Sequence, residues 1–169
     1  MKQGPLHVGV ADLLHLPGSR RVEQVEAVLG ELAVLGSHVP DGEPVVLDVR
    51  LESVNDGIVL TGMVRAPWAG ECRRCLQPVV GELAAPVLEV FEEHPVDGET
   101  RLLEVDRIDL EPVARETVLL ELPLAPLCRE DCAGLCADCG ADRNTVDCGH
   151  ALVAEDRRWA ALDELRFDE

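Results

Sequence analysis

The chain has 169 residues and a formal net charge of −18, from 33 acidic against 15 basic residues. Its hydrophobic content of 47% is enough for the core of one domain with at most a small appendage, although only 2% of the residues are aromatic. The charge argues against general affinity for polyphosphates and favours a basic protein as partner.

No segment approaches the roughly 20 apolar residues of a membrane span, and the N-terminal residues lack the apolar run of a signal peptide. We therefore expect a cytoplasmic protein. Because thiols stay reduced in the cytosol, the seven cysteines favour metal or redox chemistry over a disulfide framework.

Residues 20–36 admit two interpretations. Val22, Val25 and Leu29 recur at helical spacing, which predicts a helix. Residues 31–35 also fit a strand, which would belong to the same sheet as the strands that follow.

Residues 45–64 predict an antiparallel hairpin with one buried face, because apolar and polar side chains alternate on both sides of an Asn-Asp-Gly turn. A third strand is expected within residues 77–91, where Pro86 indicates a bulge or an edge position. The acidic, turn-rich stretch 92–107 is expected to be an exposed loop with a short strand at 102–105.

Residues 108–122 predict a helix, with Asp109 as its N-cap, Pro112 in its first turn and an apolar stripe along one side. Pro123 ends this helix, so the helix leads directly into the cysteine-rich segment. A second, short helix is expected at residues 155–167, where apolar side chains recur along one side.

Together these elements predict an α+β fold, in which an antiparallel sheet is followed by a helix leading into a zinc-binding C-terminal region and a short terminal helix. Residues 1–127 would form the α+β core, and residues 128–169 a cysteine-rich region packed on that core. The expectation of zinc rests on the spacing of the cysteines.

Seven cysteines and one histidine fall into four pairs at the spacing of metal ligands. Zinc prefers four tetrahedral donors, and a C-x-x-C knuckle supplies two thiolates from one tight turn. Eight donors would complete two Zn²⁺ sites, and a single site is the alternative. The four pairs are Cys72/Cys75, Cys128/Cys132, Cys136/Cys139 and Cys148/His150.

Loop closure favours pairing the last two of these pairs, because only a short loop joins them. The site predicted in this way contains Cys136, Cys139, Cys148 and His150. The other site then contains Cys72, Cys75, Cys128 and Cys132. Two other groupings remain open, in which the Cys136/Cys139 pair joins either the first pair or the second.

The sequence gives no sign of an enzyme. Both expected sites are closed by four protein ligands, whereas a catalytic zinc keeps one position open for water. Neither an H-E-x-x-H motif nor the H-x-E and P-C-x-x-C elements of a zinc deaminase are present. We therefore expect a non-enzymatic protein without a small-molecule substrate.

Four stretches follow one another in a characteristic order. They are LESVNDGIVLTGMVRAPWAGECRRCL, IDLEPVARETVLLELPLAPLC, GLCADCG and EDRRWAALDEL. This order resembles the YceD family, the large ribosomal RNA subunit accumulation proteins, over about residues 45–165.

The resemblance implies a bacterial, cytosolic, metal-binding protein without known enzymatic activity. Such a protein is encoded beside a small basic large-subunit ribosomal protein and is needed for normal accumulation or processing of large-subunit ribosomal RNA. The ligand role of Cys148 and His150 rests mainly on their spacing. The cysteines that match the family motif are Cys72, Cys75, Cys128, Cys132, Cys136 and Cys139.

Two functions from different classes fit these observations. In the first, an acidic surface binds a basic ribosomal protein or an assembling large subunit, and zinc holds the scaffold. In the second, the protein binds ribosomal RNA directly. A weaker, third alternative is a redox or zinc-responsive regulator. The residues expected to contact RNA or another partner are Arg73, Arg74, Arg157, Arg158 and Trp159.

Overall fold

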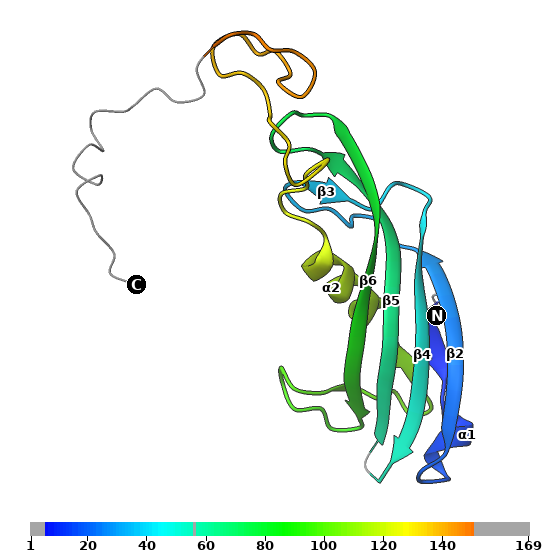
Figure 1. The fold of residues 1–169 in the computed structure, drawn as a ribbon. Coiled ribbons are helices and arrows are strands. Elements are labelled where there is room, and N and C mark those ends of the chain that lie inside the picture. The colour runs from blue at the N-terminus through cyan, green and yellow to red at the C-terminus, as the bar shows by residue number, and fades with distance from the viewer. Residues whose placement is uncertain (1–5, 56, 151–169) are drawn as a thin grey trace, which may run out of the picture.

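A computed structural model describes residues 6–55 and 57–150 of the chain. Its long strands form one extended, twisted sheet, and the cysteine-rich segment lies beyond one end of that sheet (Figure 1). In chain order the elements are β1 (His7–Gly9), α1 (Ala11–Leu14), β2 (Arg20–Val28), β3 (Ser37–His38), β4 (Pro44–Val54), β5 (Gly57–Glu71), β6 (Pro78–Glu92), β7 (Arg101–Leu102), β8 (Arg107–Asp109) and α2 (Glu111–Glu121).

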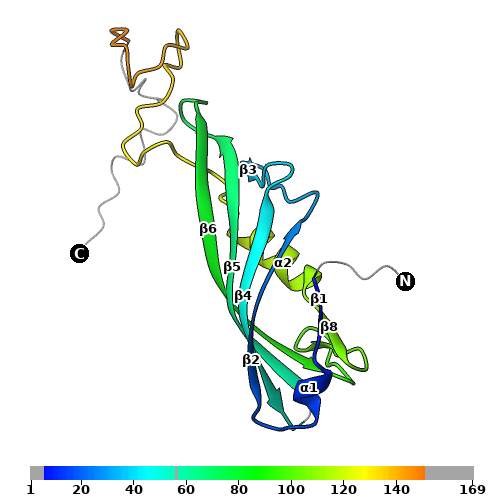
Figure 2. The same cartoon turned by 90° about the vertical axis from the view of Figure 1, so that its right-hand side faces the viewer.

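The main sheet has the strand order β2-β4-β5-β6-β7, and the short strand β3 also pairs with β5. Every pairing in this sheet is antiparallel except the two-residue contact between β6 and β7. β1 and β8 form a separate two-stranded sheet on the same side of the main sheet as α2 (Figure 2). The predicted α+β class, its central hairpin and its third strand are confirmed.

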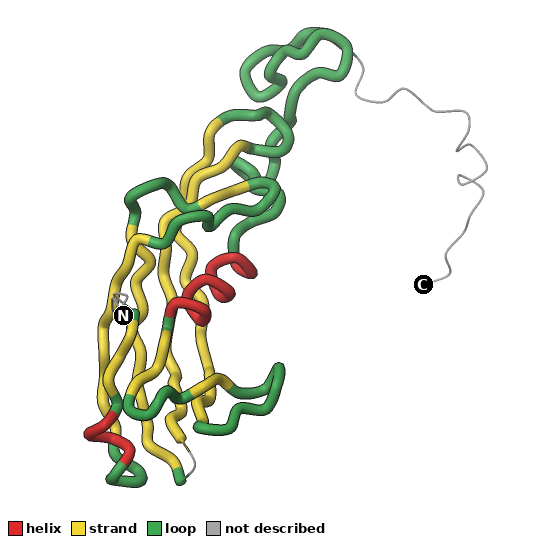
Figure 3. The backbone as a smooth tube through the Cα atoms, turned by 180° about the vertical axis from the view of Figure 1, so that it is seen from behind, coloured by secondary structure: helices red, strands yellow, loops and turns green. Residues whose placement is uncertain are grey.

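Alternation along the strands places the core on one face of the main sheet. Leu47, Val49 and Leu51 of β4 are at most 1% exposed, whereas none of the side chains between them is buried. α2 lies across this face (Figure 3), and its Val113 and Val118 are completely buried. Each fully buried valine or leucine contributes about 1.5–3 kcal/mol, so aliphatic packing holds the helix on the sheet.

Pro86 lies on an edge of the sheet, as one of the two sequence interpretations expected. β6 pairs with β5 in unbroken register along its whole length, so the strand contains no bulge. On its other side β6 pairs with β7 only at Phe91 and Glu92. A proline is tolerated on such a strand, because one side of β6 has no neighbouring strand at Pro86.

The helix predicted for residues 20–36 is wrong, because the first part of this stretch is strand β2 and pairs with β4. The strand alternative at 31–35 is also wrong, since β2 ends before it. Val25 and Ala27 occupy alternate inward positions of β2, and Arg21 forms ion pairs on the same side. Pairing with a neighbouring strand thus outweighs the helical spacing of the apolar residues.

α2 begins two residues after its expected cap. Asp109 Oδ1 accepts a hydrogen bond from the Glu111 backbone N–H over 2.9 Å, and Pro112 lies in the first turn. The terminal helix expected at residues 155–167 falls outside the described residues. Among the described residues, no helix has the length and apolar character needed to cross a membrane.

Two distant chain segments meet at one end of the main sheet. β5 ends and β6 begins on either side of residues 72–77, so the first C-x-x-C knuckle forms the turn of this long hairpin. After α2 the chain returns to this turn, where the Arg73 backbone N–H donates to the Pro126 carbonyl over 2.9 Å. This contact places the second cysteine pair, at residues 128–132, beside the knuckle.

Candidate metal centres

The first cluster joins the β5–β6 turn to the segment that follows α2. Its four sulfur atoms, from Cys72, Cys75, Cys128 and Cys132, all lie within 4.8 Å of one another. The Cys72 and Cys132 sulfurs are 3.8 Å apart, and those of Cys75 and Cys128 are 3.6 Å apart. Sulfurs bound tetrahedrally at about 2.3 Å from one zinc would be separated by about 3.8 Å, so the cluster has the size of a zinc site.

The second cluster lies farther along the cysteine-rich segment, in the orange part of the ribbon in Figure 1. The ligand atoms of Cys136, Cys139, Cys148 and His150 lie within 4.8 Å of one another, and Cys136 Sγ is 3.7 Å from His150 Nδ1. Three of the first four ligands are buried, whereas in the second cluster only Cys136 is. The second centre is therefore the more accessible to solvent.

Both C-x-x-C knuckles have the same backbone turn. In the first, the Leu76 N–H donates to the Cys72 carbonyl over 2.8 Å, and the Cys72 N–H donates to the carbonyl five residues later over 2.8 Å. In the second, the Gly140 N–H donates to the Cys136 carbonyl over 2.9 Å, and the Cys136 N–H again donates to the carbonyl five residues later. Each turn thus presents two sulfurs on one side and ends in a left-handed residue.

Backbone hydrogen bonds stabilise one thiolate in each knuckle. Burial opposes ionisation of Cys72, but hydrogen bonds from backbone groups, first that of Cys128, outweigh burial and lower its pKa to about 6. Backbone hydrogen bonds from Cys139 and Asp138 lower the pKa of Cys136 to about 6 as well. These two sulfurs are ready to bind a cation near neutral pH.

Three other thiols, those of Cys75, Cys128 and Cys139, have raised pKa values and resist ionisation unless a cation is present. Burial, followed by hydrogen bonds with Cys132 and Cys75, raises the pKa of Cys128 to about 12. Cys128 is exposed as a residue, but its sulfur faces the other thiols of the cluster, so the desolvation concerns the sulfur alone. A bound metal ion replaces these protons and removes the repulsion between neighbouring thiolates.

Asn144 supports the first cluster from within the second. It lies on the loop between Cys139 and Cys148, and its Nδ2 donates to Cys132 Sγ over 3.4 Å. Its Oδ1 accepts hydrogen bonds from the Ala133 backbone N–H over 2.9 Å and from Arg129 over 2.8 Å. Nothing in the sequence singles out this residue, because it belongs to no motif and its partners lie 11 to 15 residues away.

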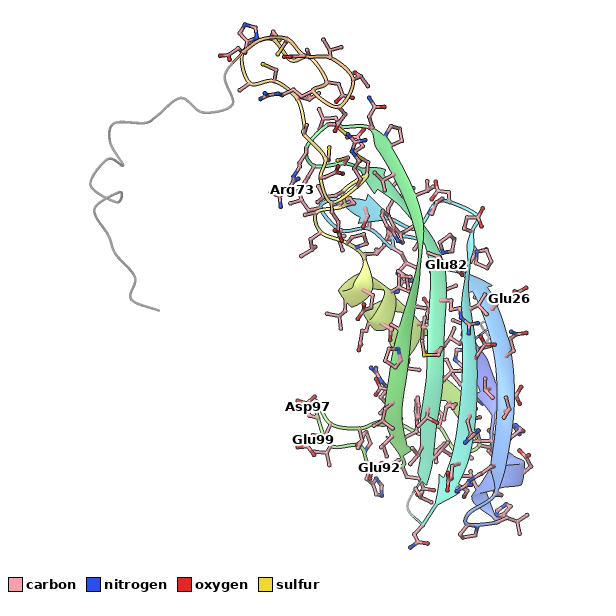
Figure 4. The ribbon with its side chains drawn as sticks, in the orientation of Figure 1. Glu26, Arg73, Glu82, Glu92, Asp97 and Glu99 are labelled. Atoms are coloured by element: carbon pink, nitrogen blue, oxygen red, sulfur yellow. The ribbon has the colours of Figure 1, made fainter. Side chains whose placement is uncertain are left out.

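The two arginines of the first knuckle differ in what they contact. The Arg74 guanidinium donates to the carbonyls of Glu130 and Cys132 over 3.1 and 3.0 Å, so it braces the cluster. Arg73 is exposed (Figure 4), and it makes no ion pair with any residue in the described part of the chain. Arg157, Arg158 and Trp159, the other expected contact residues, lie outside the described residues.

The eight candidate donors thus form two groups that could each hold a metal ion. The Cys72/Cys75 knuckle lies with Cys128 and Cys132, and not with the Cys136/Cys139 knuckle as one open alternative had it. Four sulfurs, or three sulfurs and one imidazole nitrogen, are donor sets that zinc prefers.

Comparison with known proteins gives several matches. A family model described as large ribosomal RNA subunit accumulation protein YceD matches residues 60–166. An uncharacterized protein of Mycobacterium tuberculosis is 37% identical over 171 residues, which cover 95% of this chain and 81% of that protein. YlbN of Bacillus subtilis is 28% identical over 162 residues, covering 90% of this chain and 92% of its own length.

A more distant match comes from a plant. The Arabidopsis thaliana protein named large ribosomal RNA subunit accumulation protein YCED homolog 1, chloroplastic, is 25% identical over 160 residues, covering 75% of this chain and 50% of its own length. No solved structure matches the chain significantly.

Proposed function

The chain belongs to the YceD family, and from this premise we propose that it is a non-enzymatic, zinc-binding accessory protein of the large ribosomal subunit. It acts in the cytoplasm, in the accumulation, processing or assembly of that subunit and its RNA. The description of the family supports the ribosomal part of the proposal, and the two donor sets support the choice of zinc.

The observation that carries a structural role for zinc is the closure of both clusters. Each cluster contributes four protein donors, which fill a tetrahedral shell and leave no position for a substrate or a reactive water. The first cluster also ties the end of the β5–β6 hairpin to the segment after α2, so its metal would stabilise the assembled fold.

The partner is a basic ribosomal protein or an assembling particle, and the surface charge supports this choice. Figure 4 marks acidic side chains at several levels of the sheet and on the loop after β6, including Glu26, Glu82 and Asp97. Several arginines of the sheet are paired internally, as Arg20 is with Glu52 and Arg65 with Asp48. The acidic residues that are left over can attract a cationic partner.

Direct binding of ribosomal RNA is the second candidate, and one observation favours it. Arg73 is exposed beside the first cluster and forms no ion pair among residues 6–55 and 57–150, so its guanidinium is available to a phosphate. Arg74 is not equivalent, because its contacts with Glu130 and Cys132 make it part of the scaffold. Only Arg73 can therefore be reversed in charge without disturbing the cluster.

Sedimentation with ribosomal components tests both candidates. The metal-loaded protein is mixed separately with isolated large subunits, with the proteins extracted from them and with naked large-subunit ribosomal RNA. We expect binding to the proteins and the particles that weakens with added salt, and none to naked RNA. Binding to naked RNA that Arg73→Glu abolishes would establish the second candidate, and binding to none of the three would contradict both.

A further inference from the structure

A leucine occupies a position in the first knuckle where the second knuckle has glycine. Leu76 and Gly140 each follow the last cysteine of a C-x-x-C motif, with φ angles of 61° and 73°. Both donate their N–H to the carbonyl of the first cysteine, so the backbone turn requires this left-handed conformation in each case. Glycine adopts it freely, whereas a leucine Cβ is crowded by the carbonyl oxygen.

Burial does not offset this backbone strain. The Leu76 residue is 58% exposed, so its side chain gains little from packing within the protein. Gly140 shows that the same turn forms in this chain with the unstrained residue. Packing within residues 6–55 and 57–150 therefore does not recover the cost of the left-handed backbone at Leu76.

Leu76 lines a groove of about 940 Å³ at the cysteine-bearing end of the sheet. Three segments form its walls: residues 33–38, the first knuckle with its flanking strand ends, and residues 124–126. Each wall contributes one exposed leucine, since Leu35 is 98% exposed and Leu124 is 68% exposed. Three such leucines around one groove form an apolar site of the kind that binds another protein.

The walls of the groove are held rigidly together. Ser37 is buried, and its hydroxyl donates to the Pro123 carbonyl over 2.9 Å. A Cβ on Gly70 would lie 2.4 Å from the Gly36 carbonyl oxygen, and one on Gly36 would lie 2.4 Å from the Leu124 carbonyl oxygen. Such close backbone approaches leave the groove pre-formed, which lowers the entropic cost of binding.

An acidic residue lies in, or a few residues before, each of the three wall segments. Glu31 precedes the first wall by two residues, Glu71 lies within the second, and Glu121 precedes the third by three residues; all are exposed. Arg73 is the single arginine or lysine among the residues that line the groove, which also include His38. An apolar segment flanked by lysines or arginines fits both the leucines and these carboxylates.

We propose that this groove is the docking site for such a segment of a basic large-subunit ribosomal protein, with Leu76, Leu35 and Leu124 as the apolar contacts. The proposal rests on the function proposed above and assigns it a surface. Leu76 is expected to be the central contact, because it directly follows Cys75, a member of the first metal cluster, which holds it in place.

The experiment titrates the full metal-loaded chain with purified basic proteins of the large subunit in a calorimeter at about 150 mM salt. Leu76→Gly should fold, hold its metal and melt at a temperature equal to or above that of the wild type, because glycine accepts the left-handed backbone. Leu76→Gly and Leu35→Ser should each weaken binding by about tenfold.

Val105→Gly is the matched control. Val105 is 87% exposed and also has a positive φ, of 36°, but it lies in the turn before β8, far along the chain from the groove segments. Its replacement removes the same kind of side chain in the same kind of backbone conformation and should leave the affinity unchanged.

The outcomes separate this inference from the proposed function. Wild-type affinity in both Leu76→Gly and Leu35→Ser would overturn the docking site while the function stands. If the wild type binds none of the ribosomal proteins, the docking site fails, and the proposed function fails with it if the isolated large subunit does not bind either. A dimer that Leu76→Gly converts to a monomer, measured by light scattering, would show that a second copy occupies the groove and would overturn the proposed occupant.

Discussion

Asn144 Nδ2 lies 3.4 Å from Cys132 Sγ and donates a hydrogen bond to it, which joins the loop of the second cysteine cluster to a ligand of the first. The contact is not isolated, because the Arg143 N–H donates to the Gly134 carbonyl over 2.9 Å beside it. The loop between Cys139 and Cys148 therefore supports both centres, and the geometry of the first cluster depends on this loop being folded.

Asn144→Ala should weaken metal binding at the first cluster, although Asn144 is not a ligand. Hydrogen bonds to ligating atoms typically change metal affinity by about 10–100-fold when removed. Competition with a chromophoric chelator should show one of the two metal ions released at lower chelator concentration. Val146→Ala, in the same loop and exposed, is the control, and equal affinities in the two variants would contradict the role assigned to Asn144.

Arg74→Glu should destabilise the first cluster, whereas Arg73→Glu should not. The Arg74 guanidinium donates to the carbonyls of Glu130 and Cys132, and a carboxylate in its place can donate to neither. A loss of about 0.5–1.5 kcal/mol in the free energy of unfolding is expected for Arg74→Glu. Urea unfolding of the two variants measures the difference, and similar losses in both would count against the bracing contact.

Cys72→Ser should lower stability more than Cys148→Ser. The first cluster joins Cys75 to a cysteine 53 residues away, whereas in the second cluster Cys136 and His150 are 14 residues apart. Closing the longer loop restricts the unfolded chain more, by about 1 kcal/mol from loop entropy alone. Thermal unfolding of both variants with metal present tests this order, and a larger loss in Cys148→Ser would reverse the assignment of the first cluster as the main cross-link.

The metal-free protein should gain stability as the pH rises from about 6 to about 9. The folded-state pKa values of Cys72 and Cys136 are lowered to about 6, so the unfolded chain binds more protons in this window and each proton released on folding favours the fold as pH rises. Above about pH 9 the sign reverses, because the pKa of Cys128 is raised to about 12 and its thiol stays protonated only in the folded state.

Urea unfolding under reducing conditions, at several pH values and with a chelator present, measures this profile. The Cys72→Ser, Cys136→Ser double variant is the control, since it should lose the rise between pH 6 and 9. A wild-type protein whose stability is constant or falls across that interval would contradict the pKa directions.

The sequence predicted the elements whose patterns are local. The alternation of Leu47, Val49 and Leu51 defined the hairpin, and loop length led to the expected second group of ligands. Residues 20–28 were assigned wrongly because Arg21 and Glu23 occupy inward positions of β2, so its apolar residues do not alternate as those of β4 do. Asn144 could not be predicted, since its contact with Cys132 depends on how two cysteine-bearing loops cross.

Leu76 illustrates a different limit. The sequence alone placed it after a C-x-x-C motif, but only the backbone shows that it adopts the conformation of Gly140 and stays exposed. Strain and exposure are properties of the assembled turn, so the groove became visible only in three dimensions.

Metal content per chain tests the central claim most directly, namely that two closed metal centres build this end of the protein. Elemental analysis is made on protein purified without chelator or affinity tag, beside a Cys148→Ser, His150→Ala variant. We predict two zinc ions per chain in the wild type and one in the variant, with the first cluster retained. One zinc or none in the wild type, or an unchanged content in the variant, would contradict the two-centre account.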